Sequence, residues 1–250
     1  MSAALELESI GKGPELVLLH SLLSDRSAYD RVKAELAGTF RLHLFNLPGY
    51  GGSKSEGEDT IDAYAERLAA HEVFAGKPAL LGNGFGGFVA LALAIRHPGK
   101  VSKLIAAPAL AGFPPQAKEP FRIMAAKVRE SGMQAVLDAA IQRMFPPAFI
   151  AAHPDVVAER KAALAKADPQ SFARACLALS QLDLKTELGK IKNKTLVLVG
   201  TLDQTTPAAL ARELANGIAG AQFQELPGCG HCPQIEQPDP FVAALRGFLT

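Results

Sequence analysis

The stretch Leu80-Leu81-Gly82-Asn83-Gly84-Phe85-Gly86-Gly87 decides the fold of this chain. An apolar run typical of a buried strand leads into a glycine-rich turn, and an alanine- and leucine-rich helical segment follows. A strand-to-helix turn this tight forces one residue into a strained backbone conformation, and small neighbours let the helix pack closely on the strand. We expect the helix that begins at Phe85 to direct its free N–H groups at whatever lies beside residue 84.

Segments with strand and helix character alternate on both sides of this turn. Short apolar runs predict strands over residues 5–10, 15–20, 40–45, 78–83, 101–107, 195–200 and 221–226. Helical spacing predicts helices over residues 27–37, 60–74, 85–97, 207–217 and 240–249. This alternation predicts an α/β fold with a mostly parallel central sheet that helices flank on both faces.

The segment 112–188 interrupts the alternation. It is nearly all helical in character, and proline pairs at 114–115 and 146–147 punctuate it. An insertion of this length does not fit within the sheet, so we expect it to form a helical cap over one end. The expected organisation is a core in two parts, 1–111 and 189–250, with the cap 112–188 inserted after the sixth strand.

Composition restricts the class of protein. The chain has 250 residues, of which 48% are hydrophobic and 20% charged, and its net charge is +1, so no basic face suggests nucleic acid. Three cysteines are too few for a disulfide framework, and no apolar stretch approaches the ~20 residues that span a bilayer. We expect a soluble cytoplasmic protein with a small-molecule substrate and no nucleic-acid or membrane partner. The composition does not decide whether the chain forms a homodimer.

Two polar residues follow later strands. Asp203 comes after the strand at 195–200, and His231 lies in the loop before the last helix. Asp203 would orient the imidazole of His231 and leave its other nitrogen free as a general base. Taken singly, Asp203 reads as a helix N-cap and His231 as a loop histidine. Their joint presence in this order favours the pair.

The glycines at 82, 84 and 87 also satisfy G-x-G-x-x-G, a dinucleotide-binding pattern. That pattern belongs at the first strand-to-helix turn, with an acidic residue about 20 positions later. Here three predicted strands precede it, and position 104 is a leucine. We therefore expect no nucleotide cofactor. We also expect no metal site, because the sequence does not offer enough ligand residues at the spacing that a zinc site needs.

The order of these elements resembles the α/β-hydrolase family along essentially the whole chain. In that family the turn is a nucleophile elbow, G-x-S-x-G, followed by an acid and then a histidine. The segment Asn46-Leu-Pro-Gly-Tyr-Gly-Gly-Ser53 is similar to the family's D-x-P-G-x-G-x-S turn. The loop His20-Ser21-Leu22 and the cap segments 132–149 and 168–176 are similar to 3-oxoadipate enol-lactonases, although Met144 stands where tryptophan is expected.

The resemblance implies roles for several further residues. The backbone N–H groups of Leu22 and Phe85 would form an oxyanion hole. Ser21 and Met144 would border the substrate, and the hydroxyls of Ser21 and Ser24 are expected to bond within their loop or cap a helix rather than to replace a nucleophile. If the substrate is a carboxylate, the cap residues Arg143 or Arg174 could pair with it. The alternative is that both arginines are solvated.

The departure from the pattern is Gly84, which occupies the serine position. In one interpretation His231 activates a water for attack on an ester, lactone or ketone, or abstracts a substrate proton in an elimination, isomerisation or cofactor-free oxygenation. In a second, Gly84 is an engineered Ser-to-Gly change in a serine esterase or lactonase. In a third, the chain is an inactive small-molecule binder. The presence of both Asp203 and His231 favours catalysis.

Overall fold

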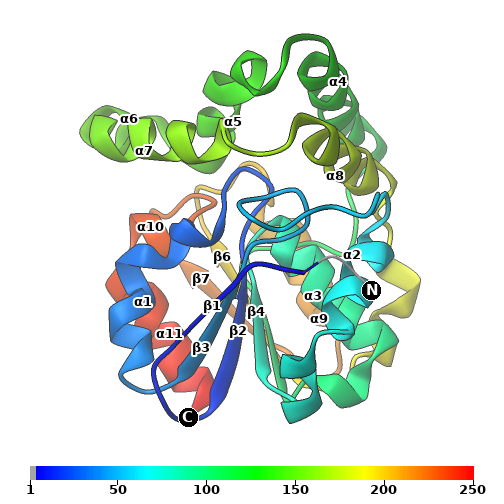
Figure 1. Cartoon of the computed structure of the whole chain (residues 1–250). Coiled ribbons are helices and arrows are strands. Elements are labelled where there is room, and N and C mark those ends of the chain that lie inside the picture. The colour runs from blue at the N-terminus through cyan, green and yellow to red at the C-terminus, as the bar shows by residue number, and fades with distance from the viewer. Residues whose placement is uncertain (1–3) are drawn as a thin grey trace.

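The computed structural model describes residues 4–250, which form one seven-stranded sheet in the order β1-β3-β2-β4-β5-β6-β7 (Figure 1). The strands are β1 (Leu7–Ile10), β2 (Glu15–Leu19), β3 (Arg41–Phe45), β4 (Ala79–Gly82), β5 (Lys103–Ala106), β6 (Lys194–Gly200) and β7 (Gln222–Leu226). Every neighbouring pair is parallel except β1 with β3. The sequence prediction of a mostly parallel sheet flanked by helices is confirmed.

Helices cover both faces of the sheet because successive strand residues point to opposite sides. In β2, Leu16 and Leu18 pack into the cluster that contains α1 (Asp30–Ala37) and α11 (Pro238–Leu249). Val17 and Leu19 pack into the other cluster. That second cluster contains α2 (Ile61–Ala69), α3 (Phe85–Arg96) and α9 (Ala208–Asn216), and it continues into the insertion.

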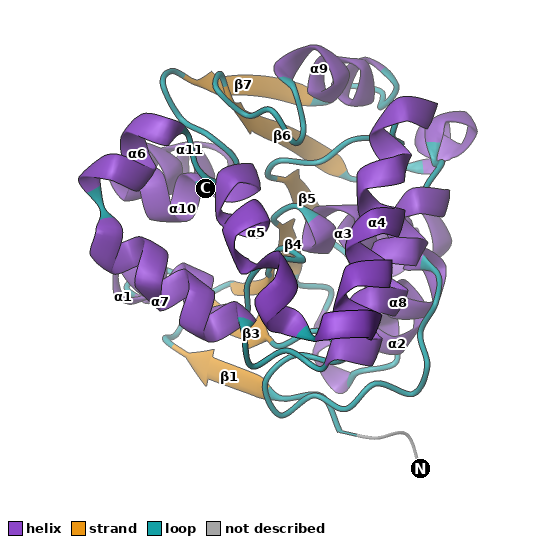
Figure 2. Ribbon diagram, turned by 90° about the horizontal axis from the view of Figure 1, so that it is seen from above, coloured by secondary structure: helices purple, strands orange, loops and turns teal. Residues whose placement is uncertain are grey.

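The insertion forms a layer of helices across the ends of the strands, as the view from above shows (Figure 2). It comprises α4 (Pro115–Ser131), α5 (Leu137–Met144), α6 (Pro147–Ala152), α7 (Pro154–Leu164) and α8 (Pro169–Gln181). Its two ends meet: Gly112 and Asp183 form an isolated β-bridge, and the Leu184 amide donates to the Ala111 carbonyl at 2.6 Å. We call this junction the neck of the cap.

The expected position of the cap was one strand too late. In the described residues the insertion follows the fifth strand, β5, and not the sixth. The five strands before the insertion are the five apolar runs predicted before residue 112, so those runs were right and only the count of six was wrong.

Two helix boundaries also differ from the expected ones. The helix predicted over 60–74 ends at Ala69, because His71 has an extended backbone and caps a separate 3₁₀ turn, Glu72–Gly76, by accepting from the Val73 amide. The last helix begins at Pro238 and is preceded by the short α10 (Pro233–Glu236). Proline is well placed at a first helical position, where it removes no hydrogen bond.

Helix α3 lies unusually close to the strands beneath it. A Cβ added to Gly82 would lie 2.1 Å from the Gly86 carbonyl oxygen, and one added to Gly86 would lie 2.4 Å from the Leu19 carbonyl oxygen. At both points backbone therefore contacts backbone, so the two glycines set the distance between α3 and the strands β2 and β4.

Replacing Gly86→Ala is therefore expected to destabilise the chain by about 1–3 kcal/mol or more, since the new methyl group has no free space. The matched control is Gly247→Ala on α11, where no heavy atom lies within 4 Å of the added Cβ. It should stabilise by about 0.5–1 kcal/mol, because alanine loses less backbone entropy in a helix. Urea unfolding measures both, and equal stability of the two variants would contradict the close approach of α3.

Candidate active site

Three loops bring Gly84, Asp203 and His231 together at the carboxyl edge of the sheet. They follow β4, β6 and β7 respectively. The Nδ1 atom of His231 lies 2.8 Å from Oδ2 of Asp203, and both side chains are buried. A Cβ added to Gly84 would lie 2.9 Å from Nε2 of His231, the opposite nitrogen. The imidazole thus stands between the carboxylate and the position of the absent side chain.

Gly84 has φ +52° and ψ −116°, a conformation that residues with a side chain rarely adopt. It lies between β4 and the first residue of α3, where the sharp turn was expected. The strained geometry of an elbow is therefore present, but in this chain a glycine adopts it without steric cost.

Asp203 holds two sets of partners at once. Its Oδ1 accepts from the amides of Thr205 and Thr206 at 2.8 Å each, while its Oδ2 faces His231 and accepts from the Thr206 hydroxyl. Burial alone would raise the pKa of Asp203, but the charge of His231 and these hydrogen bonds outweigh it and hold that pKa below its usual range. One carboxylate oxygen of Asp203 thus caps its loop, while the other orients His231.

The backbone N–H groups of Leu22 and Phe85 are oriented by hydrogen bonds to the carbonyl groups of the same peptide units, which belong to Ser21 and Gly84. The Ser21 carbonyl accepts from His20 Nδ1 at 2.8 Å and from the Ser24 amide at 3.2 Å. The Gly84 carbonyl accepts from the amides of residues 87 and 88, at 2.8 and 3.1 Å. In a trans peptide the N–H points opposite to the C=O. Neither N–H donates to any residue in the described range 4–250, and both residues line the same cavity.

His20 locks the first of these peptides. Its Nε2 accepts from the Leu47 amide at 2.9 Å, so Nδ1 carries the proton that is donated to the Ser21 carbonyl. Burial lowers the pKa of His20 to about 4, which keeps the ring neutral and preserves this tautomer.

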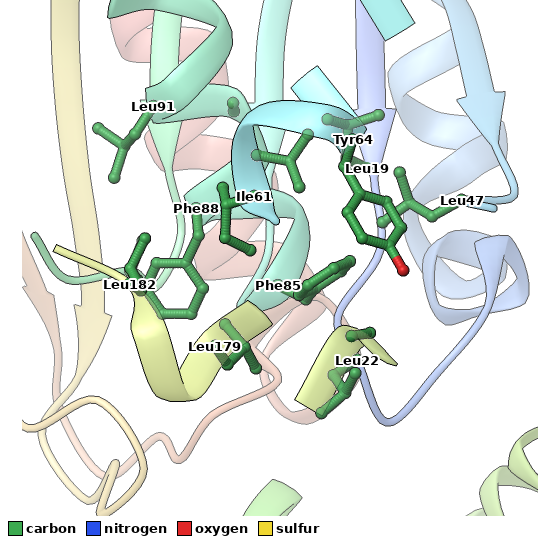
Figure 3. Close-up of a cluster of buried hydrophobic side chains, with 14 of the residues drawn as sticks. Leu19, Leu22, Leu47, Ile61, Tyr64, Phe85, Phe88, Leu91, Leu179 and Leu182 are labelled. Atoms are coloured by element: carbon green, nitrogen blue, oxygen red, sulfur yellow. The ribbon is translucent and has the colours of Figure 1, made fainter. Parts of the chain in front are cut away.

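The side chains of Leu22 and Phe85 are anchored in the hydrophobic cluster that joins the core to the cap (Figure 3). The Phe85 ring meets Tyr64 edge-on, with 4.9 Å between centroids. Leu179 of α8 belongs to the same cluster, and the Tyr50 hydroxyl donates to the Leu22 carbonyl at 2.7 Å. Packing thus fixes both amide donors from the side-chain end as well.

A small cavity lies between these amides and the cap. Its apolar lining comes mainly from Phe88, Phe113, Phe121, Met124 and Leu179. The polar lining comes from Ser21, Arg143, Thr205, Thr206 and His231. We call it the Gly84 cavity. Its character, mostly apolar with a few convergent polar groups, is that of a small-molecule site.

Arg143 brings a partly buried positive charge to this cavity. Its guanidinium lies over the Phe121 ring, 5.1 Å from the centroid, and it forms no ion pair with any residue between 4 and 250. Burial lowers the pKa of Arg143 because the charged form has lost solvation, and the negative charge of Asp203 offsets this only in part.

The other residues expected near the substrate are distributed differently. Met144 lines a second cavity of about 700 Å³, which Arg143 and His231 also line, and its carbonyl accepts from the His231 amide at 3.2 Å. Arg174 does not line either cavity: it donates to the hydroxyls of Ser55 and Ser171, at 3.0 and 2.9 Å.

The two loop serines behave differently from each other. The Ser24 hydroxyl donates to the Asp25 carbonyl and accepts from Arg160, as expected of a residue that bonds within its surroundings. The same expectation was wrong for Ser21. Its hydroxyl has no hydrogen-bond partner in the described part of the chain and instead borders the Gly84 cavity, because its carbonyl is the group that the loop bonds.

Sequence reasoning missed two residues that hold the site in place. Asn83 Nδ2 donates to the carbonyls of Ala107 and His231, at 2.7 and 3.1 Å, and so ties the elbow to the histidine loop. The Glu236 carboxylate accepts from the amides of Gly230 and Cys232, at 2.7 and 2.9 Å, on either side of His231. Each resembles an ordinary turn or helix residue in the sequence, so no local signal marks it.

Residues 4–250 offer neither a metal-binding cluster nor a membrane-spanning helix. No group of three or more His, Cys, Asp or Glu side chains there could hold a metal ion. In the same range, no helix is both long and apolar enough to cross a membrane.

The fold and this arrangement define an α/β hydrolase. The chain belongs to the alpha/beta hydrolase family, whose model matches residues 16–244. It is 30% identical to the pimeloyl-[acyl-carrier protein] methyl ester esterase of Chromobacterium violaceum, covering 97% of each chain. Among solved structures, the enol-lactonase from Burkholderia xenovorans LB400 is similar with a TM-score of 0.90 at 30% identity, covering 98% of this chain and 96% of the other. A thermophilic esterase from Thermogutta terrifontis has a TM-score of 0.89 at 30% identity, covering 98% and 92%.

The buried, neutral His20 predicts a pH-dependent stability. Its pKa of about 4 lies below the ~6.5 of a histidine in an unfolded chain, so between these values the unfolded state binds a proton that the folded state does not. The free energy of unfolding should therefore fall as the pH falls through this window, by roughly 2 kcal/mol between about pH 7 and pH 5. Urea unfolding of the unmodified chain and His20→Gln tests this, and an equally steep pH dependence in the variant would contradict it.

Proposed function

We propose that this chain hydrolyses a small ester or lactone, with His231 as general base and Asp203 as the residue that orients it. The observation that carries the proposal is the position of His231 Nε2. This atom faces residue 84, beside the N–H groups of Leu22 and Phe85, which donate to no residue in the described range. The relationship to esterases supports the same reaction class.

The chemistry follows from these positions. Gly84 offers no nucleophile, so the attacking oxygen comes from a water or from another hydroxyl, and His231 Nε2 takes its proton. The carbonyl oxygen of the substrate becomes negatively charged, and the amides of Leu22 and Phe85 donate to it. Asp203 stabilises the imidazolium that forms, which then returns the proton to the leaving alkoxide.

Arg143 supports a narrower substrate class. A partly buried guanidinium without an ion pair gains most from a ligand that carries a carboxylate, because a charge-assisted hydrogen bond replaces the lost solvation. We propose that the substrate carries a carboxylate in addition to its ester or lactone, and that this carboxylate pairs with Arg143 rather than with Arg174. The second cavity, which also reaches Arg143 and His231, offers an open approach from solvent.

Substitution of the two cap arginines tests the substrate class. Arg143→Met should raise KM for the monomethyl ester of a short dicarboxylic acid roughly 10–100-fold, as expected for the loss of one charged hydrogen-bonding partner. KM for the uncharged dimethyl ester should change little. Arg174→Met is the matched control, since that side chain bonds outside the Gly84 cavity. Equal effects of Arg143→Met on both esters, or selectivity lost only in Arg174→Met, would exclude Arg143 as the carboxylate partner.

Installation of a serine at the elbow tests the rest of the machinery. Gly84→Ser, made together with Ser21→Ala because the added Cβ would lie 2.5 Å from Ser21 Oγ, should raise the hydrolysis of p-nitrophenyl acetate at least about 100-fold over Ser21→Ala alone, because a serine nucleophile in such a site contributes up to about 10⁶ in turnover. The gain should fall by roughly 10²–10⁴ when His231→Ala is added.

Gly84→Ala controls for the altered backbone and should bring no gain. A folded Gly84→Ser protein without increased activity would show that the base and the amides are not arranged for acyl transfer. In that case, stoichiometric binding of an intact ester by the unmodified chain would favour a binding protein.

A further inference from the structure

We propose that Ser21 supplies the nucleophile that Gly84 lacks, so that the acyl group is carried on the loop after β2 instead of on the elbow. This inference rests on the proposed hydrolytic function and adds to it a covalent intermediate on a named residue.

The Ser21 side chain occupies the space of the missing side chain. A Cβ built on Gly84 would lie 2.5 Å from Ser21 Oγ and 3.1 Å from Ser21 Cβ. The same point lies 2.9 Å from His231 Nε2. The hydroxyl and the base therefore border one small volume, the volume that a serine at position 84 would fill. A water placed there would have to share it with Ser21.

Ser21 is also set apart from the other buried serines. Within residues 4–250 these are Ser21, Ser24, Ser53, Ser171 and Ser180. The hydroxyls of the last four each make a hydrogen bond within the chain, whereas the Ser21 hydroxyl makes none. Only 2% of Ser21 is exposed, so its hydroxyl faces the Gly84 cavity without a partner. The Ser21 hydroxyl is therefore free to meet a ligand that enters the Gly84 cavity.

The oxyanion donors suit attack from this position. Leu22 follows Ser21 in the chain just as Phe85 follows Gly84, so each amide belongs to the residue after a nucleophile position. The Ser21 backbone is held by His20 and by the Ser24 amide, which leaves rotation about the Cα–Cβ bond as the motion that brings Oγ toward His231 Nε2.

The reaction balances with the groups present. His231 Nε2 takes the hydroxyl proton as Ser21 Oγ forms a bond to the carbonyl carbon, and the oxyanion is held by the two amides. The bond to the leaving oxygen then breaks, and the alkoxide takes the proton from His231. A water, deprotonated by His231, attacks the acyl-Ser21 ester, which releases the acid and restores the hydroxyl.

Chemical labelling and kinetics test the proposal. A fluorophosphonate probe, which reacts with activated serines, should label the unmodified chain on the peptide that contains Ser21, as read by mass spectrometry. Ser21→Ala should abolish the label and lower kcat for a carboxylate-bearing ester by at least about 10³-fold. His231→Ala should slow labelling by roughly 10²–10⁴.

The matched control is Ser180→Ala, which removes a buried hydroxyl that donates to the Leu177 carbonyl and does not line the Gly84 cavity. It should keep both the label and the activity. Circular dichroism and thermal unfolding of each variant establish that it is folded.

The outcomes separate this inference from the proposed function. If the unmodified chain and Ser21→Ala hydrolyse esters equally and no label appears, water is the nucleophile: the inference is wrong and the function stands. If Ser21→Ala loses activity but the unmodified chain is never labelled and gives no transfer of its acyl group to added methanol, Ser21 acts without a covalent bond, which also overturns the inference. If the unmodified chain hydrolyses nothing, both proposals fail.

Discussion

Helix α3 touches β2 and β4 with its backbone, and the geometry of the site depends on this contact. Since glycines at 82 and 86 leave no side chain between them, the Gly86 amide reaches the His20 carbonyl at 3.0 Å. The Asn83 amide likewise reaches the Leu19 carbonyl at 2.9 Å. These bonds fix the elbow against the loop after β2. A helix held one side chain further away would separate the two amides that now converge on one cavity.

The chain treats its buried ionisable groups in different ways. Asp203 stays charged because amides, a hydroxyl and an imidazole compensate for its burial. His20 stays neutral because burial lowers its pKa to about 4, and each ring nitrogen has a partner that suits the uncharged tautomer. Arg143 alone among these three keeps a charge without a partner of opposite sign. Arg143 lines the Gly84 cavity and Asp203 does not, so the charge that faces this cavity is positive and favours an anionic ligand.

Much of the fold followed from the sequence, because apolar strands that alternate with helices have few solutions other than a parallel sheet. The carboxyl ends of such strands share one edge, so the chain order of Gly84, Asp203 and His231 was enough to predict their proximity. The rotamer of Ser21 and the links made by Asn83 were not predictable, since they depend on contacts between residues far apart in sequence. The expected placement of the cap after a sixth strand was wrong, although the five apolar runs before residue 112 are the five strands that precede the cap.

The neck of the cap has a consequence for how such a protein can change over time. Gly112 and Asp183 pair directly, so the sheet meets the insertion at two adjoining points whatever lies between them. Lengthening or remodelling the intervening chain costs little in loop entropy and leaves the strand register untouched. Substrate preference can therefore diversify through the cap while the inherited acid, base and amide donors keep their places.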